Sequence, residues 1–171
     1  MTLYDNIEKT AHIGETFVLW LCCKSSLNDA YFPLRENRSL ELTFDSDMTF
    51  RSNFANSETT KLSGAAPAYS LEAKHALRQN KIIADAKIKI KYDEKEWGFN
   101  VISEELALTS IKIPAQLTSK TDEKLYERQY LIEELLSLVE ELYYDFLCLR
   151  LDESAWEKEA HVLQNWIQHD E

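Results

Sequence analysis

Apolar and polar residues alternate most clearly between residues 82 and 92 of this chain. There Lys87, Lys89 and Lys91 separate apolar neighbours, in the pattern AKIKIKY. Successive side chains of a strand point to opposite faces, so the pattern predicts a strand with one apolar face and one row of ammonium groups.

Two further strands are predicted at 96–102 and 106–113, each after a connection of about three polar residues. Short connections join neighbouring antiparallel strands, so we expect a three-strand meander. Earlier in the chain, residues 39–44 and 48–54 also alternate, on either side of Asp45-Ser46-Asp47. This arrangement predicts a β-hairpin.

Helical spacing of apolar residues appears first at 13–24, IGETFVLWLCCK, which predicts a short buried helix. A further strand is predicted at 58–62. Ser70 is a suitable cap for a second short helix at about 71–80.

The last third of the chain has a helical pattern throughout. Thr121, followed by two acidic residues, predicts the start of a helix of roughly 28 residues. Ser154 and Glu157 have the spacing of a capping box, which predicts a final helix. Apolar residues recur along the long helix at spacings of three and four, at Ile132, Leu135, Val139, Leu142, Phe146 and Leu149.

Additional apolar residues beside this seam, Leu136, Tyr143 and Leu147, widen the apolar face of the long helix. A single small sheet is not expected to cover all of it, and a large exposed apolar patch usually marks an interface. We therefore expect a homodimer with the helix at the interface. The interface residues expected are Ile132, Leu135, Val139, Leu142 and Phe146.

Strands grouped apart from long helices are typical of the α+β class. We expect an antiparallel sheet, made of the hairpin and the meander, packed on one face by the long C-terminal helix and shorter helices. The length of 171 residues suits a single domain, 1–171. Residues 1–120 would form mainly sheet with two short helices, and 121–171 an acidic helical segment.

The composition and the N-terminal sequence indicate in which compartment we expect the protein. The chain contains no apolar run long enough to span a membrane, and its polar N-terminus does not resemble a secretory signal. Its three cysteines lack the even number and spacing of a disulfide framework. We expect a cytoplasmic protein with reduced thiols and no membrane contact.

Charge is distributed unevenly along the chain. The net charge is −11, and residues 121–171 hold 14 acidic and 4 basic residues. Between 74 and 91 only Asp85 is acidic, and we expect no acid to lie between Lys87, Lys89 and Lys91 on their face of the strand. A stripe of this kind would contact phosphates without reading bases; the alternative is a solvated sheet face whose lysines discourage aggregation. The candidate DNA-binding residues are Lys74, Arg78, Lys81, Lys87, Lys89 and Lys91.

Enzyme signatures are mostly missing from the sequence. It has no glycine-rich phosphate loop, no nucleophile elbow and no His-Glu-x-x-His motif, and its four histidines are scattered. Asp45 and Asp47 could bind a divalent cation, but Asp-Ser-Asp is also ordinary turn chemistry. We therefore expect no enzyme activity, no catalytic residues, no cofactor and no metal; a metal-dependent nuclease is a remote alternative.

Residues 59–114 resemble the core of the RdgC recombination-associated proteins. The helix, the turn, the aromatic strand and the last strand of that core correspond here to Leu77, Asn80-Lys81-Ile82-Ile83, Trp97-Gly98-Phe99 and Leu106-Ala107-Leu108 with Ile111-Lys112. Residues 13–26 resemble a segment of short RdgC-like bacterial proteins, and the two C-terminal helices fit them as well. The chain thus resembles a short form related to the C-terminal half of the family.

The resemblance implies a protein that binds DNA without marked sequence preference, forms a ring-shaped dimer with a basic inner surface, and restrains RecA-driven recombination in the nucleoid. For this chain it implies DNA contact through the basic residues at 74–91. The competing hypothesis is an acidic protein–protein interaction and oligomerisation module that does not bind DNA.

Overall fold

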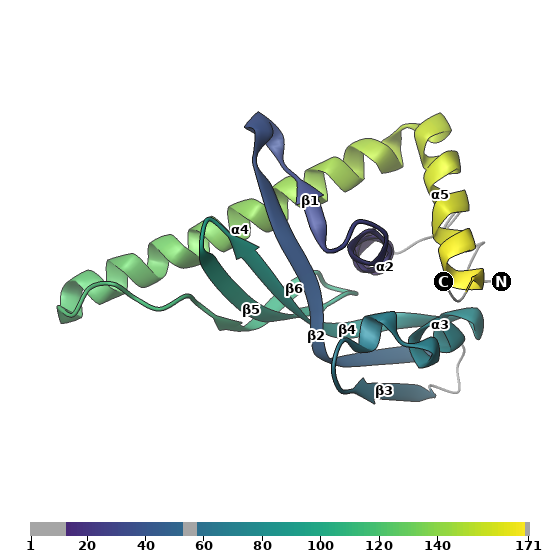
Figure 1. Cartoon of the computed structure of the whole chain (residues 1–171), viewed down its shortest axis with the longest axis horizontal. Helices are drawn as coiled ribbons and strands as arrows, with labels where there is room; N and C mark the ends of the chain where they lie inside the picture. Colours follow the sequence, from purple (N-terminus) through teal and green to yellow (C-terminus); the bar gives the residue numbers. More distant parts are fainter. Residues whose placement is uncertain (1–12, 53–57, 170–171) are drawn as a thin grey trace.

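A six-stranded antiparallel sheet forms the centre of the structure, a computed structural model that describes residues 13–52 and 58–169 (Figure 1). The strand order is β1-β2-β4-β5-β6, and β3 pairs with the second half of β2. The strands are β1 Tyr31–Pro33, β2 Ser39–Ser52, β3 Thr59–Ser63, β4 Lys81–Tyr92, β5 Lys95–Ile102 and β6 Ala107–Lys112.

The alternation in β4 sorts its side chains as predicted. Ala86, Ile88 and Ile90 are buried in the core, whereas the lysines between them lie half-buried or exposed on the opposite face. The neighbouring strand β5 alternates in the same way and buries Trp97 and Phe99. The predicted meander of β4, β5 and β6 is confirmed.

The hairpin predicted between 39–44 and 48–54 is not formed within the described residues, because β2 continues through Asp45-Ser46-Asp47 as one strand; residues 53 and 54 lie outside the described part. The pairing of β2 with β4 shifts register between Phe44 and Met48, which makes the acidic segment a bulge and not a turn. Both halves of β2 pair with β4, and this shared partner holds the strand continuous. The strand that follows β2 in the chain and pairs with it antiparallel is β3.

Within the described residues, four helices accompany the sheet: α2 Ile13–Leu27, α3 Leu71–Arg78, α4 Thr121–Leu151 and α5 Glu153–Gln168. Short 3-10 turns lie at η2 Arg35–Asn37 and η3 Pro67–Tyr69. Ser70 caps α3 as predicted, since its hydroxyl accepts a hydrogen bond from the Ala73 amide at 3.1 Å. The final helix begins earlier than the expected capping box, because Asp152 accepts from the Ala155 amide at 3.0 Å.

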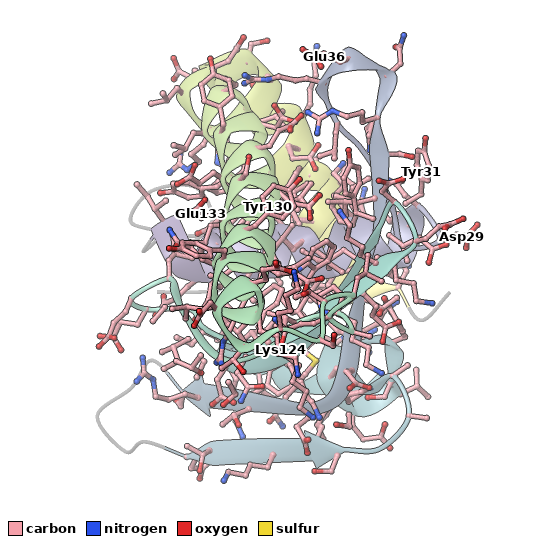
Figure 2. The ribbon with its side chains drawn as sticks, turned by 90° about the vertical axis from the view of Figure 1, so that its left-hand side faces the viewer. Asp29, Tyr31, Glu36, Lys124, Tyr130 and Glu133 are labelled. Atoms are coloured by element: carbon pink, nitrogen blue, oxygen red, sulfur yellow. The ribbon has the colours of Figure 1, made fainter. Side chains whose placement is uncertain are left out.

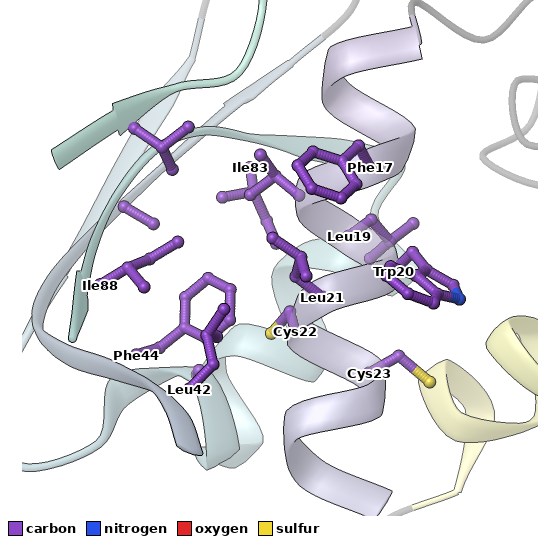
Figure 3. Close-up of a cluster of buried hydrophobic side chains, with 14 of the residues drawn as sticks. Phe17, Leu19, Trp20, Leu21, Cys22, Cys23, Leu42, Phe44, Ile83 and Ile88 are labelled. Atoms are coloured by element: carbon purple, nitrogen blue, oxygen red, sulfur yellow. The ribbon is translucent and has the colours of Figure 1, made fainter. Parts of the chain in front are cut away.

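Helix α2 lies at the centre of the core and contacts the sheet as well as helices α4 and α5. Figure 3 shows Leu21 on the side facing Leu42 and Phe44 of the sheet, while Cys23 points toward α5. Trp20 lies within ring-contact distance of Phe146 of α4, with centroids 5.7 Å apart. A helix apolar on several faces is expected to be buried, which matches this position.

Close backbone contact fixes the start of α2. A Cβ atom placed on Gly14 would lie 2.0 Å from the carbonyl oxygen of Ser103 and 2.9 Å from Cγ of Leu106. Only glycine fits between α2 and the β5–β6 connection at this point. The hydroxyl of Ser103 in turn donates to the carbonyl of Ile83 at 2.6 Å and holds the connection against β4.

The α+β class, the antiparallel sheet and the long C-terminal helix are therefore confirmed. In the part of the chain that the structure describes, no helix combines the length and hydrophobicity needed to cross a membrane.

Candidate functional site

The structure divides the predicted basic patch into separate groups. Lys74 and Arg78 lie on α3 and point at the C-terminal end of α5. The ammonium of Lys74 donates to the carbonyl of His169, and Nε of Arg78 donates to the carbonyl of Ile167 at 2.8 Å. The C-terminal end of a helix is the negative end of its dipole, which a cation stabilises. The buried Lys74 occupies this position on α5. These two residues join α3 to α5 and do not extend the lysine row.

Lys81 also has partners within the chain. Its ammonium donates to the hydroxyl of Thr60 on β3 at 2.8 Å and lies 3.8 Å from a carboxylate oxygen of Glu58. Its contacts are therefore with β3 and the residue before it, at the edge of the sheet.

Lys87, Lys89 and Lys91 do form a row on the outer face of β4, and acids of the neighbouring strands lie between them. Nζ of Lys87 and of Lys89 is 3.6 and 3.4 Å from the same oxygen of Asp45 on β2. Nζ of Lys91 is 3.9 Å from Glu41 of β2, and it also lies 3.8 Å from Glu96 of β5. The expectation that no acid interrupts the row is wrong, because adjacent strands supply the acids.

The predicted interface seam is also largely internal. Leu135, Leu142 and Phe146 are buried by the chain's own sheet and by α2, so they cannot meet a second copy. Ile132 and Val139 are half-buried. The prediction that this seam forms the interface is therefore corrected for its three buried members.

An apolar surface does exist at the other end of α4. We call residues 115–130 the arm: the connection that follows β6 and the first ten residues of α4. In Figure 1 this part of α4 extends beyond the sheet, and Figure 2 shows Lys124 and Tyr130 from that end. Four large apolar side chains of the arm are exposed: Leu117 by 96%, Leu125 by 67%, Tyr126 by 72% and Tyr130 by 59%.

Hydrogen bonds give the arm a defined shape. The carboxylate of Glu127 accepts from the amide of Leu117 at 2.7 Å and from the amide of Thr118 at 3.2 Å. The side-chain amide of Gln116 donates to the carbonyl of Lys124 at 2.7 Å. The connection is therefore held against the first turns of α4, and Leu117 is presented on an ordered surface.

Charge on the arm differs from that of the remaining acidic helices. Between residues 120 and 128 three basic residues match three acidic ones. Residues 129–171 carry 11 acidic and 2 basic residues. The arm is thus an electrically neutral, apolar surface on a strongly acidic segment.

An apolar pocket of about 200 Å³ lies among α2, the sheet and the middle of α4. Leu21 of α2, Ile88 of β4 and Phe99 of β5 line its inner part. Val139 and Tyr143 of α4 line the side toward the surface.

Asp45 and Asp47, the candidate metal ligands, have structural roles. Asp45 is shared by two lysines, and the carboxylate of Asp47 accepts from Ser46 at 2.8 Å and from Ser63 at 3.0 Å. These hydrogen bonds, the one from Ser46 first, lower the pKa of Asp47. Within 13–52 and 58–169, no three His, Cys, Asp or Glu residues are grouped to hold a metal ion.

A buried serine beside an open pocket is the remaining chemical candidate. The hydroxyl of Ser25 donates to the carbonyl of Leu42 at 2.7 Å and lies 2.5 Å from the hydroxyl of Tyr69. Burial raises the pKa of Tyr69. Because the Ser25 proton is committed to a backbone carbonyl, the arrangement fastens α2, β2 and η3 together and does not activate a nucleophile.

Sequence reasoning missed the arm, although its residues gave a signal: Leu125, Tyr126 and Tyr130 lie outside the expected seam. Comparison of the chain with models of known protein families and with curated proteins finds no match.

Proposed function

We propose that this protein is a non-enzymatic binding module that associates with a second copy of itself through the arm. The observation that carries the proposal is the exposure of Leu117, Leu125, Tyr126 and Tyr130 on a segment held in a fixed shape. Exposed apolar surfaces of this kind mark interfaces, and two-fold dimers are the commonest assemblies.

A second copy is the partner that the charge distribution favours. Two molecules of net charge −11 repel each other, and most of the repulsion comes from the helical segment. The balanced charges of 120–128 offer a place where two copies can approach without facing like charges. The arm also exposes Tyr126 and Tyr130. Tyrosine suits a protein interface, because it can bury a large ring while its hydroxyl stays in water.

The test is the mass of the protein in solution. Sedimentation equilibrium over a range of concentrations should report a dimer for the natural chain, and a monomer for the variant Leu125→Ser, Tyr126→Ser. Matched controls are Leu151→Ser and Tyr31→Ser, because these residues are of the same types and are also exposed but lie outside the arm. A natural chain that stays monomeric at tens of micromolar and unfolds cooperatively would overturn the proposal.

DNA contact through the outer face of the sheet is the second candidate. It is supported by the lysine row on β4, whose ion pairs of 3.4–3.9 Å are long and partly exposed. Exposed pairs of this kind contribute little, so a phosphate oxygen could replace the carboxylate. The resemblance of residues 59–114 to the RdgC proteins, which act in DNA recombination, also supports this candidate. The intervening acids weigh against it.

A titration with duplex DNA at several salt concentrations separates the two candidates. If the row binds phosphates, replacing Lys87, Lys89 and Lys91 by Gln should lower the log–log salt slope by about 0.9 for each lost contact. Lys158→Gln, on the exposed face of α5, is the control. A folded triple variant with an unchanged slope would remove the row from any DNA site, whereas the arm proposal would be unaffected.

A further inference from the structure

We infer that the apolar pocket beneath α4 is a binding site for a compact apolar molecule that carries a positive charge. Fourteen residues from α2, the sheet, the β5–β6 connection and α4 line the pocket, and Glu140 is the one charged residue among them. The inference is independent of the arm, because the pocket lies where α4 already contacts the core.

The size of the pocket limits the ligand. An apolar protein cavity of about 150 Å³ stays dry and binds benzene. The present pocket, at about 200 Å³, takes one aromatic ring with a short substituent. Its walls are aliphatic and aromatic, so the ligand body must be apolar.

The burial of the lining residues indicates where the pocket opens. Leu42, Ile88 and Ile90 are 0–1% exposed and form its inner end. Leu136 is 41% exposed and Glu140 is also exposed, which places the entrance along this side of α4. Figure 3 shows the inner wall, where Phe17 and Leu21 of α2 lie opposite Ile88 and Leu42.

Charge at the entrance determines the polar end of the ligand. Two other carboxylates of α4 are already paired, since Glu134 binds Lys95 and Glu141 binds Arg38, each at 2.9 Å. Glu140 makes no ion pair with any described residue. A ligand ammonium can therefore pair with Glu140 while its ring enters the pocket, whereas a ligand carboxylate would be repelled.

Methyl NMR with two probes of the same body and opposite charge tests the inference. Added 2-phenylethylamine should cause saturable shifts of the methyl groups of Ile88, Val101 and Leu108. Added 3-phenylpropionate at the same concentration should cause much smaller ones. Glu140→Gln should weaken amine binding by roughly two- to fivefold, the range expected for an exposed ion pair, without changing the binding of neutral ethylbenzene.

Filling the pocket provides the decisive variant. Val139→Phe should abolish binding of both the amine and ethylbenzene, whereas Val162→Phe on α5, outside the pocket, should leave it intact. Leu108→Phe fills the pocket from the opposite wall and serves if Val139→Phe does not fold. Absence of saturable shifts in the natural chain, equal binding by folded Val139→Phe or Leu108→Phe, or binding of the carboxylate as tight as that of the amine would each overturn the inference.

Discussion

The indole nitrogen of Trp97 donates a hydrogen bond to the carbonyl oxygen of Leu131 at 2.9 Å, and this bond joins β5 to α4 where the helix reaches the core. Leu131 is the first buried residue of α4, and Trp97 is fully buried. Close by, the ammonium of Lys95 binds both carboxylate oxygens of Glu134, and this hydrogen bonding raises the pKa of Lys95. Together the two contacts mark the boundary between the packed helix and the arm.

Replacing Trp97 with Phe should lower the free energy of unfolding by about 1–3 kcal/mol, because the buried hydrogen bond is lost and the smaller ring leaves space. Urea unfolding followed by circular dichroism measures the change. Trp166→Phe is the matched control, since the indole nitrogen of Trp166 is buried without a hydrogen-bond partner among the described residues. Equal losses in the two variants would contradict the role given to the Trp97 bond.

Replacing Lys74 with Met should lower the free energy of unfolding by roughly 1–2 kcal/mol. The change removes a cation from the carbonyl end of α5 and from a position 5.6 Å above the ring of Trp166. Thermal unfolding measures the loss. Lys158→Met, exposed on α5, should change stability little. A Lys74→Met variant as stable as the natural chain would argue that the lysine is not a structural cap.

Thiol reagents should find one fast-reacting cysteine in the folded protein. Burial raises the pKa of Cys23 to about 12 and raises that of Cys22 further, with the neighbouring Cys23 as a lesser cause. Cys148 is exposed. Since the thiolate is the reactive form, a mildly alkaline solution of Ellman's reagent should titrate one thiol rapidly, and all three after denaturation. Rapid reaction of three thiols in the native state would refute the burial of α2.

The same two thiols should make stability fall as the solution becomes alkaline. Their folded pKa values lie above the unfolded value near 9, so in this range the unfolded chain releases protons that the folded chain retains. Each thiol then lowers the free energy of unfolding by up to about 1.4 kcal/mol per pH unit. Urea unfolding at several values above pH 9 measures the slope.

The double variant Cys22→Ala, Cys23→Ala isolates the contribution of the thiols, because the other alkaline groups remain in it. Its free energy of unfolding should depend less steeply on pH over the same range. Parallel pH curves for the variant and the natural chain would contradict the prediction.

Much of the fold can be predicted from the sequence because alternation and helical spacing are local signals. The meander from β4 to β6 and the cap of α3 at Ser70 follow from such signals directly. The bulge in β2 does not, because Asp45-Ser46-Asp47 has the composition of a turn. What keeps it extended is pairing with β4, a partner far along the chain.

The candidate site is less predictable, because its properties depend on neighbours in space. Lys89 stands among bases in sequence order, yet Asp45 of the adjacent strand lies 3.4 Å away. Leu135 and Leu125 both have helical spacing, but only Leu135 is buried. The length of the sheet determines which part of a long helix is covered. That length cannot be read from the sequence of the helix itself.

The bulged strand β2 affects how this chain can fold during its synthesis. It pairs with β1, β3 and β4, and its longest partnership joins Glu41 to Lys91 and Ser52 to Lys81. During synthesis, β2 leaves the ribosome well before β4, so one long edge stays unpaired while the intervening residues are added. Closing that gap costs chain entropy before any contact is gained, which slows folding. Pairing of β2 with β4 is therefore the step at which a nascent chain commits to the native structure or to aggregation.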